Sequence, residues 1–288
     1  MTDKYAVIGN PIAHSKSPEI HTMFADQFKG TPAGDIVYKD RILVPPKGFT
    51  EAVERLRKEG YKGCNVTVPF KSEAFQLATE FTPRAKVAQA VNTLKFDGDT
   101  IIGDNTDGTG LTFDIRFNLH IKLSKQRVLL LGAGGAANGV ALPLVQVGAN
   151  ITIVNRTADK AEKLATRIPF IRPNAQHDNA SKNYTGKSQW CSYDDLVGQF
   201  NVVINATSTG LSDEMPPLPP GIFAPGALAY DMMYGRETRF MKFAREHGAA
   251  IVSDGLGMLV EQAAESFYIW RNVRPETAPV IAVLRQQQ

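Results

Sequence analysis

Three groups of polar side chains in the first part of the chain exceed what folding alone requires. The first is Ser15-Lys16-Ser17, the second runs from Asn65 to Lys71, and the third joins Asn92-Thr93 to the segment from Asp104 to Gly108. Together they supply hydroxyl, amide, ammonium and carboxylate groups. Such groups bind polar ligands, and an ammonium beside a carboxylate can move a proton. The pattern indicates a pocket for a polar, hydroxylated substrate.

Within these groups, Lys71 and Asp107 are the candidates for chemistry. Lys71 follows a predicted strand from Cys64 to Val68 that Pro69 ends, and α/β proteins place their sites just past such strand ends. A lysine ammonium can give a proton to a carbonyl oxygen while the carbon receives a hydride, and a carboxylate can hold the lysine and balance its charge. Taken singly, each residue also has a structural explanation, since Asp caps turns and Lys commonly extends into solvent.

The predicted strand from Cys64 to Val68 also carries two of the candidate binding residues. Side chains alternate along a strand, so Asn65 and Thr67 share one face while Val66 and Val68 share the other. We therefore expect a polar face that serves the site and an apolar face opposite to it.

Hydride transfer requires a carrier, and the stretch from Arg127 to Thr157 is typical of a dinucleotide site. An unbroken apolar run from Val128 to Leu131 predicts a buried strand, and Ile151 to Val154 predicts a second one. Between them lie the turn Gly132-Ala133-Gly134-Gly135-Ala136 and an apolar helical pattern. The first glycine permits the tight turn, the next lets a pyrophosphate approach the backbone, and the helix N-terminus holds its charge. This is a βαβ unit with the dinucleotide fingerprint in its proper context.

The residues after the second strand indicate which carrier binds. NAD sites usually have a carboxylate there, about 20 residues past the glycines, that bonds the ribose 2′-hydroxyl. This chain has Asn155-Arg156-Thr157 instead, with Lys160 one helical turn later. A carboxylate would repel a 2′-phosphate, whereas a guanidinium can bind it with two charge-assisted bonds. The sequence therefore predicts NADP.

Composition restricts the other possibilities. The chain has 288 residues, 43% hydrophobic and 21% charged, with a net charge of +3, and no basic cluster that favours nucleic acid. No apolar run approaches the length of a membrane span, and the first residues lack the pattern of a secretory signal, so we expect a cytoplasmic location. The two cysteines are far apart and the five histidines are scattered, so we expect neither a disulfide nor a metal site.

Strands and helices alternate both before and after the dinucleotide unit. We predict an α/β fold of two domains: an N-terminal substrate-binding, catalytic domain of residues 1–107, completed by 256–288, and a doubly wound, Rossmann-type domain of residues 108–255. Ser17 is expected to cap a first helix, and residues 169–189 to form a surface excursion without function. The C-terminal helices are expected to return to the first domain. The expected strands are 5–9, 64–68, 91–96, 100–103, 128–131, 151–154, 201–205, 227–230 and 249–252, and the expected helices include 49–58, 240–246 and 257–270.

The chain resembles the shikimate dehydrogenase family, and the similar segments follow one another along its whole length. They are Gly9 to Pro18, Asn65 to Lys71, Ala90 to Thr93, Gly103 to Gly108, Gly132 to Ala136, Asn155 to Thr157, Asn205 to Ser208, Asp231 to Tyr234 and Asp254 to Leu259. So many motifs in the same order make chance agreement remote.

The resemblance implies reversible reduction of 3-dehydroshikimate to shikimate by NADPH, in the biosynthesis of chorismate and the aromatic amino acids. Carried over by position, it implies that Lys71 and Asp107 are the catalytic pair. It assigns binding of the substrate's hydroxyls and carboxylate to Ser15, Ser17, Asn65, Thr67, Asn92, Tyr234 and Gln262. It assigns the NADP site to Gly132, Ala133, Gly134, Gly135, Ala136, Asn155, Arg156, Thr157 and Lys160, with Met232 and Gly255 near the nicotinamide.

Two other functions remain open on the sequence alone. One is a broader quinate/shikimate dehydrogenase that uses NAD, against which Asn155-Arg156-Thr157 argues. The other is a non-catalytic relative that senses a metabolite or nucleotide, against which Lys71 and Asp107 argue. In every case we expect a small-molecule ligand, no nucleic-acid or membrane partner, and a monomer or homodimer.

Overall fold

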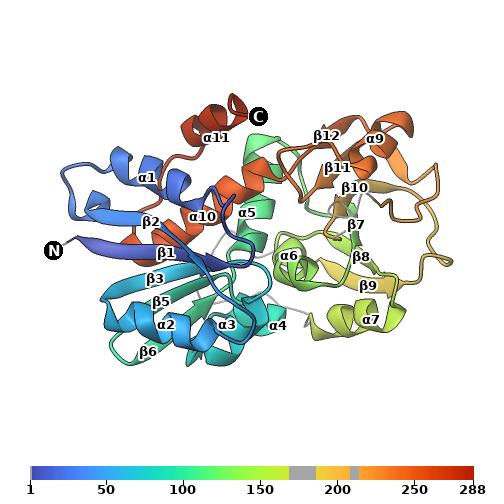
Figure 1. Ribbon diagram of the computed structural model, residues 1–288. Coiled ribbons are helices and arrows are strands. Elements are labelled where there is room, and N and C mark those ends of the chain that lie inside the picture. Colours follow the sequence, from blue (N-terminus) through green and yellow to red (C-terminus); the bar gives the residue numbers. More distant parts are fainter. Residues whose placement is uncertain (1, 169–185, 208–213) are drawn as a thin grey trace, which may run out of the picture. The chain divides into compact units, whose positions relative to one another are not determined.

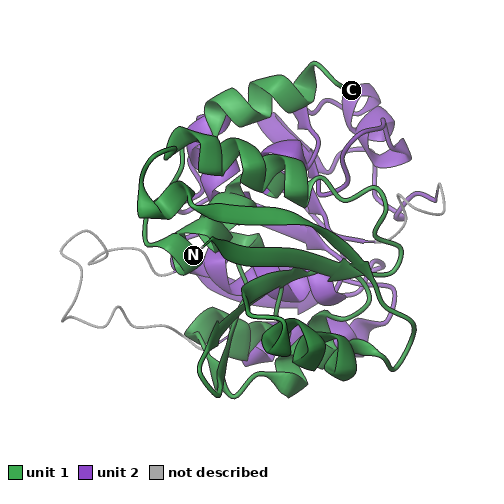
Figure 2. Ribbon diagram, turned by 60° about the vertical axis from the view of Figure 1, so that its left-hand side comes forward, with its two compact units in different colours: residues 1–110, 259–287 green, residues 111–258, 288 purple. Residues whose placement is uncertain are grey.

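The computed structural model describes residues 2–168, 186–207 and 214–288, which form two compact units (Figures 1 and 2). Unit 1 consists of Met1–Gly110 and Leu259–Gln287, and unit 2 of Leu111–Met258 with Gln288. The chain passes from one unit to the other within two helices, α5 (Asp107–Phe113) and α10 (Leu256–Arg271). The α/β fold in two parts that the sequence predicts is confirmed.

Unit 1 is built on a mixed, six-stranded sheet with the order β2-β1-β3-β5-β6-β4. Strand β1 lies between β2 and β3 and is parallel to both, whereas β5 is antiparallel to β3 and β6. The parallel part therefore brings the carboxyl ends of β1 and β3 to one edge of the sheet. The strands are β1 (Asp3–Gly9), β2 (Ile36–Leu43), β3 (Tyr61–Val66), β4 (Glu80–Phe81), β5 (Thr93–Asp97) and β6 (Thr100–Asp104).

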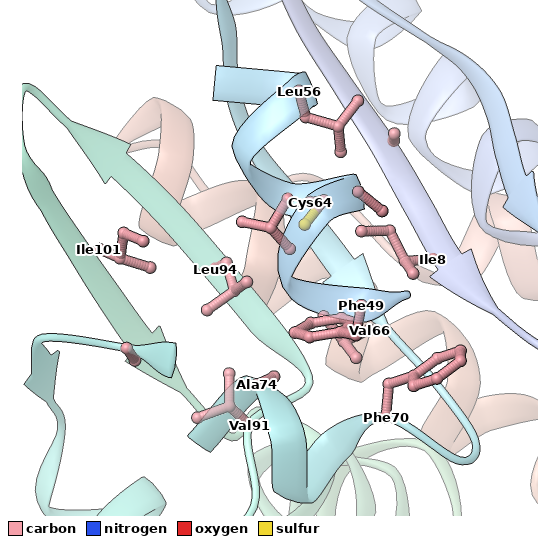
Figure 3. Packing of buried hydrophobic residues seen from close by; sticks show 14 of the residues in the cluster. Ile8, Phe49, Leu56, Cys64, Val66, Phe70, Ala74, Val91, Leu94 and Ile101 are labelled. Atoms are coloured by element: carbon pink, nitrogen blue, oxygen red, sulfur yellow. The ribbon is translucent and has the colours of Figure 1, made fainter. Parts of the chain in front are cut away.

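Helices pack on both faces of this sheet because its strands carry apolar side chains on each side. Ile8 and Cys64 pack with Phe49 and Leu56 of α2 in one buried cluster (Figure 3). Tyr5 and other residues of the opposite face pack on Trp270 of α10. The remaining helices of this unit are α1 (Ser17–Gln27), α2 (Phe49–Lys58), α3 (Lys71–Leu77), α4 (Pro83–Ala88) and α11 (Ala278–Arg285), with a 3₁₀ turn at Pro32–Gly34.

Unit 2 is built on a six-stranded, fully parallel sheet with the order β12-β11-β10-β7-β8-β9. The strand order reverses between β7 and β10, which makes this the switch point where doubly wound sheets bind ligands. The strands are β7 (Arg127–Leu131), β8 (Asn150–Val154), β9 (Lys187–Cys191), β10 (Phe200–Asn205), β11 (Phe223–Asp231) and β12 (Ile251–Ser253). The helices are α6 (Gly135–Gln146), α7 (Ala158–Arg167) and α9 (Arg239–Glu246), preceded by a π-helical turn at Asp114–Asn118.

Several local expectations differ from the structure. Residues 187–189 belong to β9, so the expected excursion across 169–189 is wrong there, and 169–185 lie outside the described residues. Ser17 is the first residue of α1, with Lys16 at the cap position, so it does not cap this helix. β3 ends at Val66, and the turn that follows leaves Val68 64% exposed instead of buried on an apolar face. β2 was not expected from the sequence.

Among the residues that the structure describes, no helix has both the length and the apolar character needed to cross a membrane.

Candidate active site

Lys71 and Asp107 stand in direct contact in unit 1. Lys71 begins α3 and Asp107 begins α5, so each side chain projects from the first turn of a helix. Lys71 Nζ donates to Asp107 Oδ2 at 2.5 Å. The side chains are 21% and 8% exposed, which removes most water from the pair while leaving the lysine accessible. The two residues that the sequence marks for chemistry thus form one ion pair.

Asn92 fixes the other oxygen of the Asp107 carboxylate. Its Nδ2 donates to Asp107 Oδ1 at 2.8 Å and lies 3.2 Å from Gln262 Oε1. Its own Oδ1 accepts from the backbone N–H of Thr106 at 2.9 Å. Because the two carboxylate oxygens have different partners, the Asp107 side chain is held in one orientation. Four predicted residues of this unit, Lys71, Asn92, Asp107 and Gln262, are therefore connected by hydrogen bonds.

Asn65 is joined to this group through a buried hydroxyl cluster. Its Nδ2 lies 3.0 Å from Ser266 Oγ and 3.2 Å from Thr93 Oγ1, and Ser266 Oγ lies 3.3 Å from Thr106 Oγ1. Asn65 Oδ1 accepts a hydrogen bond from the Tyr38 hydroxyl at 2.8 Å. The Asn65 amide is thus fully engaged within the protein, so a substrate group that binds to it must replace one of these partners.

His21 supports Asn65 from the other side. Its ring stacks on Tyr38 with centroids 4.3 Å apart, and its Nε2 lies 3.2 Å from Asn65 Oδ1. An amide oxygen only accepts, so Nε2 carries the proton and Nδ1 does not. Complete burial lowers the pKa of His21 to about 3, because the charged ring would be desolvated. His21 is therefore neutral near pH 7.

The two predicted serines lie beside this cluster, and Thr67 lies at the turn before Lys71. Ser15 Oγ is 3.2 Å from Ser17 Oγ. Burial raises the pKa of Tyr38, the partner of Asn65, and the Ser17 side chain beside it partly offsets that rise. Thr67 is half-buried, and its methyl group lies 2.5 Å from the place where a Cβ on Gly9 would stand. Only glycine at position 9 lets these two loops approach so closely.

The glycine turn of unit 2 has the geometry of a phosphate site. Gly132 has a φ of +105°, which favours glycine, and it joins the end of β7 to the start of α6. Gly134 caps α6 and Gly135 begins it, and a Cβ added at either would meet no atom of the described residues within 4 Å, apart from its chain neighbours and the helix's own backbone. Open space at the first amides of a helix is what a pyrophosphate needs. Ala133 is buried and Ala136 half-buried in the same turn.

The residues that follow β8 present positive charge next to this turn. Arg156 and Lys160 are exposed, and neither side chain has an ion-pair or hydrogen-bond partner in the described parts of the chain. Asn155 Nδ2 donates to the Thr157 carbonyl at 2.9 Å, which shapes the loop between β8 and α7. The residues present therefore fit a dinucleotide with an additional phosphate.

Met232 and Gly255 are also brought together in unit 2. A Cβ on Gly255 would lie 2.4 Å from the Met232 carbonyl oxygen, and Gly255 N donates to the Met233 carbonyl at 2.8 Å. Asp231 anchors this loop, since it accepts from Met233 N at 2.9 Å and from the Thr238 hydroxyl at 2.5 Å. Burial raises the pKa of Asp231. Tyr234 belongs to unit 2, half-buried just after this loop, and burial raises the pKa of its hydroxyl.

Sequence reasoning did not identify Ser266, Tyr38 or His21. Ser266 is fully buried, and it lies one helical turn after Gln262, to whose carbonyl it donates at 3.1 Å. Gln262 and Ser266 are polar residues at i, i+4 spacing and therefore share one face of α10, which is a signal that would have found Ser266. Tyr38 lies in the unexpected strand β2, and no local pattern points to it. His21 lies on the apolar face of α1.

Family models for shikimate dehydrogenases match three stretches of the chain. The model described as "Shikimate dehydrogenase substrate binding domain" matches residues 7–94. "Shikimate / quinate 5-dehydrogenase" matches residues 115–210, and "Shikimate 5'-dehydrogenase C-terminal domain" matches residues 255–285.

Individual relatives are similar over almost their whole length. The chain is 55% identical over 285 residues to a protein named "Shikimate dehydrogenase (NADP(+))" from Methylobacillus flagellatus, covering 98% of this chain and 99% of the relative. It is 54% identical over 288 residues to a protein of the same name from Aromatoleum aromaticum, covering 99% and 98%.

Solved structures have the same fold. An Ael1 enzyme from Pseudomonas putida superposes with a TM-score of 0.85 at 43% identity, with 98% of each chain covered. Shikimate 5-dehydrogenase from Thermus thermophilus, in complex with NADP(H) and shikimate, superposes with a TM-score of 0.82 at 28% identity, with 100% of each chain covered.

Proposed function

The chain belongs to the shikimate dehydrogenase family, and from that premise we propose that it catalyses the reversible reduction of 3-dehydroshikimate to shikimate with NADPH. It is an NADP-dependent oxidoreductase of the shikimate pathway. The observation that carries the catalytic assignment is the 2.5 Å contact between Lys71 and Asp107 in a largely buried polar cluster.

The catalytic roles follow from the chemistry of this pair. NADPH supplies the hydride that reduces the ketone carbon. Lys71 gives a proton from its ammonium to the ketone oxygen, so that an alcohol forms, and the lysine regains its proton from solvent. Asp107 holds the lysine in place and balances the charge of its ammonium group. In the reverse direction, neutral Lys71 accepts the proton of the alcohol.

We assign substrate binding to the polar residues around the pair. Ser15, Ser17, Asn65, Thr67, Asn92 and Gln262 of unit 1, with Tyr234, are proposed to bind the hydroxyls and the carboxylate of shikimate. The support in unit 1 is the continuous hydrogen-bonding from Lys71 through Asp107 and Asn92 to Gln262. The domains are assigned accordingly: residues 1–107 with 256–288 bind the substrate, and residues 108–255 bind NADP.

The cofactor residues are assigned by role. The turn from Gly132 to Ala136 is proposed to bind the pyrophosphate with its backbone amides. Asn155, Arg156, Thr157 and Lys160 are proposed to bind the adenosine and its 2′-phosphate, and Met232 and Gly255 to contact the nicotinamide. The support is the open space at Gly134 and the exposed cations after β8.

A steady-state assay tests the function directly. Shikimate or quinate is supplied with NADP or NAD, and the absorbance of reduced nicotinamide is followed. We expect the highest kcat/KM with shikimate and NADP. A preference for NAD or for quinate would favour the broader quinate/shikimate dehydrogenase, and binding of shikimate without turnover would favour the sensor.

We further propose that the enzyme works in the cytoplasm as a monomer or homodimer, without a nucleic-acid or membrane partner. The small net charge of +3 supports the absence of a nucleic-acid partner, because nucleic-acid binding requires a concentrated basic surface. Light scattering coupled to size exclusion measures the oligomeric state.

A further inference from the structure

Arg84, in the first turn of α4, contacts three other segments of unit 1 through one guanidinium. Its Nε and Nη2 donate to Asp104 Oδ1 and Oδ2, each at 2.7 Å, as a bidentate pair. Its Nη1 donates to Thr109 Oγ1 at 2.6 Å, and Nη2 also lies 2.9 Å from Glu265 Oε1. The Arg84 side chain is 21% exposed and its Asp104 partner 5%. These charges are therefore mostly shielded from water and interact strongly.

The partners of Arg84 lie on both sides of Asp107. Asp104 ends β6 and Thr109 lies in the first turn of α5, so the guanidinium spans the turn that carries Asp107. A path of hydrogen bonds leads inward from Asp104. Its Oδ1 accepts from Asn105 N at 2.6 Å, and Asn105 Oδ1 accepts from Asp107 N at 3.2 Å.

A second path reaches the same carboxylate through α10. Glu265, the third partner of Arg84, lies one turn after Gln262 on this helix. Gln262 Oε1 is 3.2 Å from Asn92 Nδ2, which donates to Asp107 Oδ1 at 2.8 Å. Arg84 is thus connected to the backbone of Asp107 by one route and to its side chain by the other.

We propose that Arg84 is a positioning residue for the reaction, whose guanidinium holds the turn between β6 and α5 so that the Asp107 carboxylate stays against Lys71. This inference rests on the proposed function, since it concerns the residue that holds the proton donor. It requires arginine, because a lysine ammonium is a point charge that cannot span Asp104, Thr109 and Glu265 in one plane. A displacement of about 1 Å at a reacting group can cost about 100-fold in rate.

The decisive comparison is between Arg84→Lys and Arg274→Ala. Arg274 is a matched control, because it also makes two ion pairs on α10, at 2.8 Å to Glu261 and 2.8 Å to Glu265, and is 27% exposed. Single-turnover formation of NADPH at saturating shikimate and NADP, and shikimate binding by calorimetry, are measured for each variant, with thermal unfolding as a check on folding.

We expect Arg84→Lys to lower the single-turnover rate by roughly 10- to 100-fold while the Kd for shikimate changes less than about threefold. Arg274→Ala should lower the unfolding midpoint but keep the rate within about threefold of wild type. If Arg84→Lys does not fold, Thr109→Val is measured in its place, because among the hydrogen bonds of the guanidinium it removes only the one between Arg84 Nη1 and Thr109 Oγ1. It should lower the rate several-fold with unchanged binding.

A wild-type rate in Arg84→Lys would overturn the proposal. If Arg84→Lys does not fold, a wild-type rate in Thr109→Val would do so instead. So would a loss of rate in Arg274→Ala as large as in Arg84→Lys, because then any loss of ion pairs on α10 has the same effect. Asp107→Asn separates this failure from failure of the proposed function. If Asp107→Asn is inactive while Arg84→Lys keeps the wild-type rate, only the role of Arg84 is wrong. If Asp107→Asn is fully active, the catalytic assignment itself is refuted.

Discussion

At the scale of single residues, the site depends on how one carboxylate divides its hydrogen bonds. Asp107 Oδ2 accepts from Lys71 and Oδ1 from Asn92, so neither oxygen can turn away without losing a charge-assisted bond. Behind them, Asn65 and Ser266 form a buried layer that orders these groups. The site therefore combines a few groups for chemistry with more groups that keep them in place.

Lys71→Ala should lower kcat by about 100-fold or more, because general acid/base catalysis is lost while the binding groups remain. The KM for shikimate should change less than about threefold. Steady-state kinetics measure both, with the exposed Lys29→Ala as the control for loss of a lysine. A variant that turns over near the wild-type rate would show that Lys71 only positions the substrate.

Arg156→Ala should raise the KM for NADP by roughly tenfold or more and leave the KM for NAD unchanged, since only NADP carries the 2′-phosphate. Lys163 is an exposed lysine of α7, the helix that follows Arg156, and Lys163→Ala serves as the control. An equal rise of KM for both cofactors would argue against a phosphate contact.

His21 makes stability depend on pH. The unfolded histidine binds a proton below about pH 6.5, whereas the folded one, with a pKa of about 3, does not, so stability is lost as pH falls from 6.5 toward 3. Between pH 7.5 and 5 this amounts to about 2 kcal/mol. Urea unfolding at both pH values should show that wild type loses more stability than His21→Phe, which keeps the ring but does not titrate. Equal losses in the two proteins would contradict the assigned pKa.

At the scale of elements, several of the residues to which we assign a function lie where a helix begins. Lys71 and Asp107 begin α3 and α5, and Gly134 caps α6. The first turn of a helix has backbone amides without a partner inside the helix, and such amides can bind an anionic ligand. In the turn after β7, Gly132 and Gly134 are required for different physical reasons.

Gly132→Ala should lower stability, whereas Gly134→Ala should weaken NADP binding. At Gly132 the φ of +105° and a carbonyl oxygen 3.0 Å from the added Cβ predict destabilisation, by about 1–3 kcal/mol. At Gly134 the Cβ enters open space, so stability without ligand should not change, yet the methyl group should weaken NADP binding. Thermal unfolding and NADP titration test the pair. If Gly134→Ala binds NADP as tightly as wild type, the pyrophosphate does not bind at this turn.

Elements with strong local patterns could be predicted from the sequence. The helix at 49–58 has the expected limits because its apolar residues keep helical spacing, and the glycine turn is confirmed because its residues are diagnostic. β9 could not be predicted, since its sequence Lys-Ser-Gln-Trp-Cys is polar and lies at the sheet edge, where burial imposes no alternation. β2 is also an edge strand.

In the candidate site, too, some residues could be predicted from the sequence and others could not. Lys71 and Asp107 are recognisable because their types and positions suggest chemistry. The bonds of Arg84 and Ser266 join residues far apart in the chain, and only the tertiary fold brings them together. Tyr234 and Gln262 came from the family resemblance, not from a local pattern.

At the scale of the whole molecule, each of the two units is built on its own six-stranded sheet. Unit 1 carries the Lys71–Asp107 cluster on a mixed sheet, and unit 2 carries the glycine turn on a parallel one. The proposed division between substrate and cofactor binding can be tested without catalysis, because each ligand alone should protect its own set of backbone amides.

Hydrogen exchange followed by mass spectrometry should show this division. NADP alone should slow exchange at residues 132–138 and 155–157, and shikimate alone at residues 104–108 and 262–266. Each ligand stabilises the segments that it binds. NADP protection confined to residues 104–108 and 262–266 would refute the domain assignment.

The discontinuity of unit 1 has a consequence for how the protein is made. By the time a ribosome has translated Ser253, every described strand of both sheets exists, yet Gln262, Glu265 and Ser266 have still to be added. A nascent polypeptide can thus form the glycine turn after β7 well before Asn92 and Arg84 meet their partners on α10. A premature stop codon just after this point would release a product that contains every described strand but lacks α10, so one face of the unit 1 sheet would lose Trp270 and Asn92 and Arg84 would lose their partners on that helix.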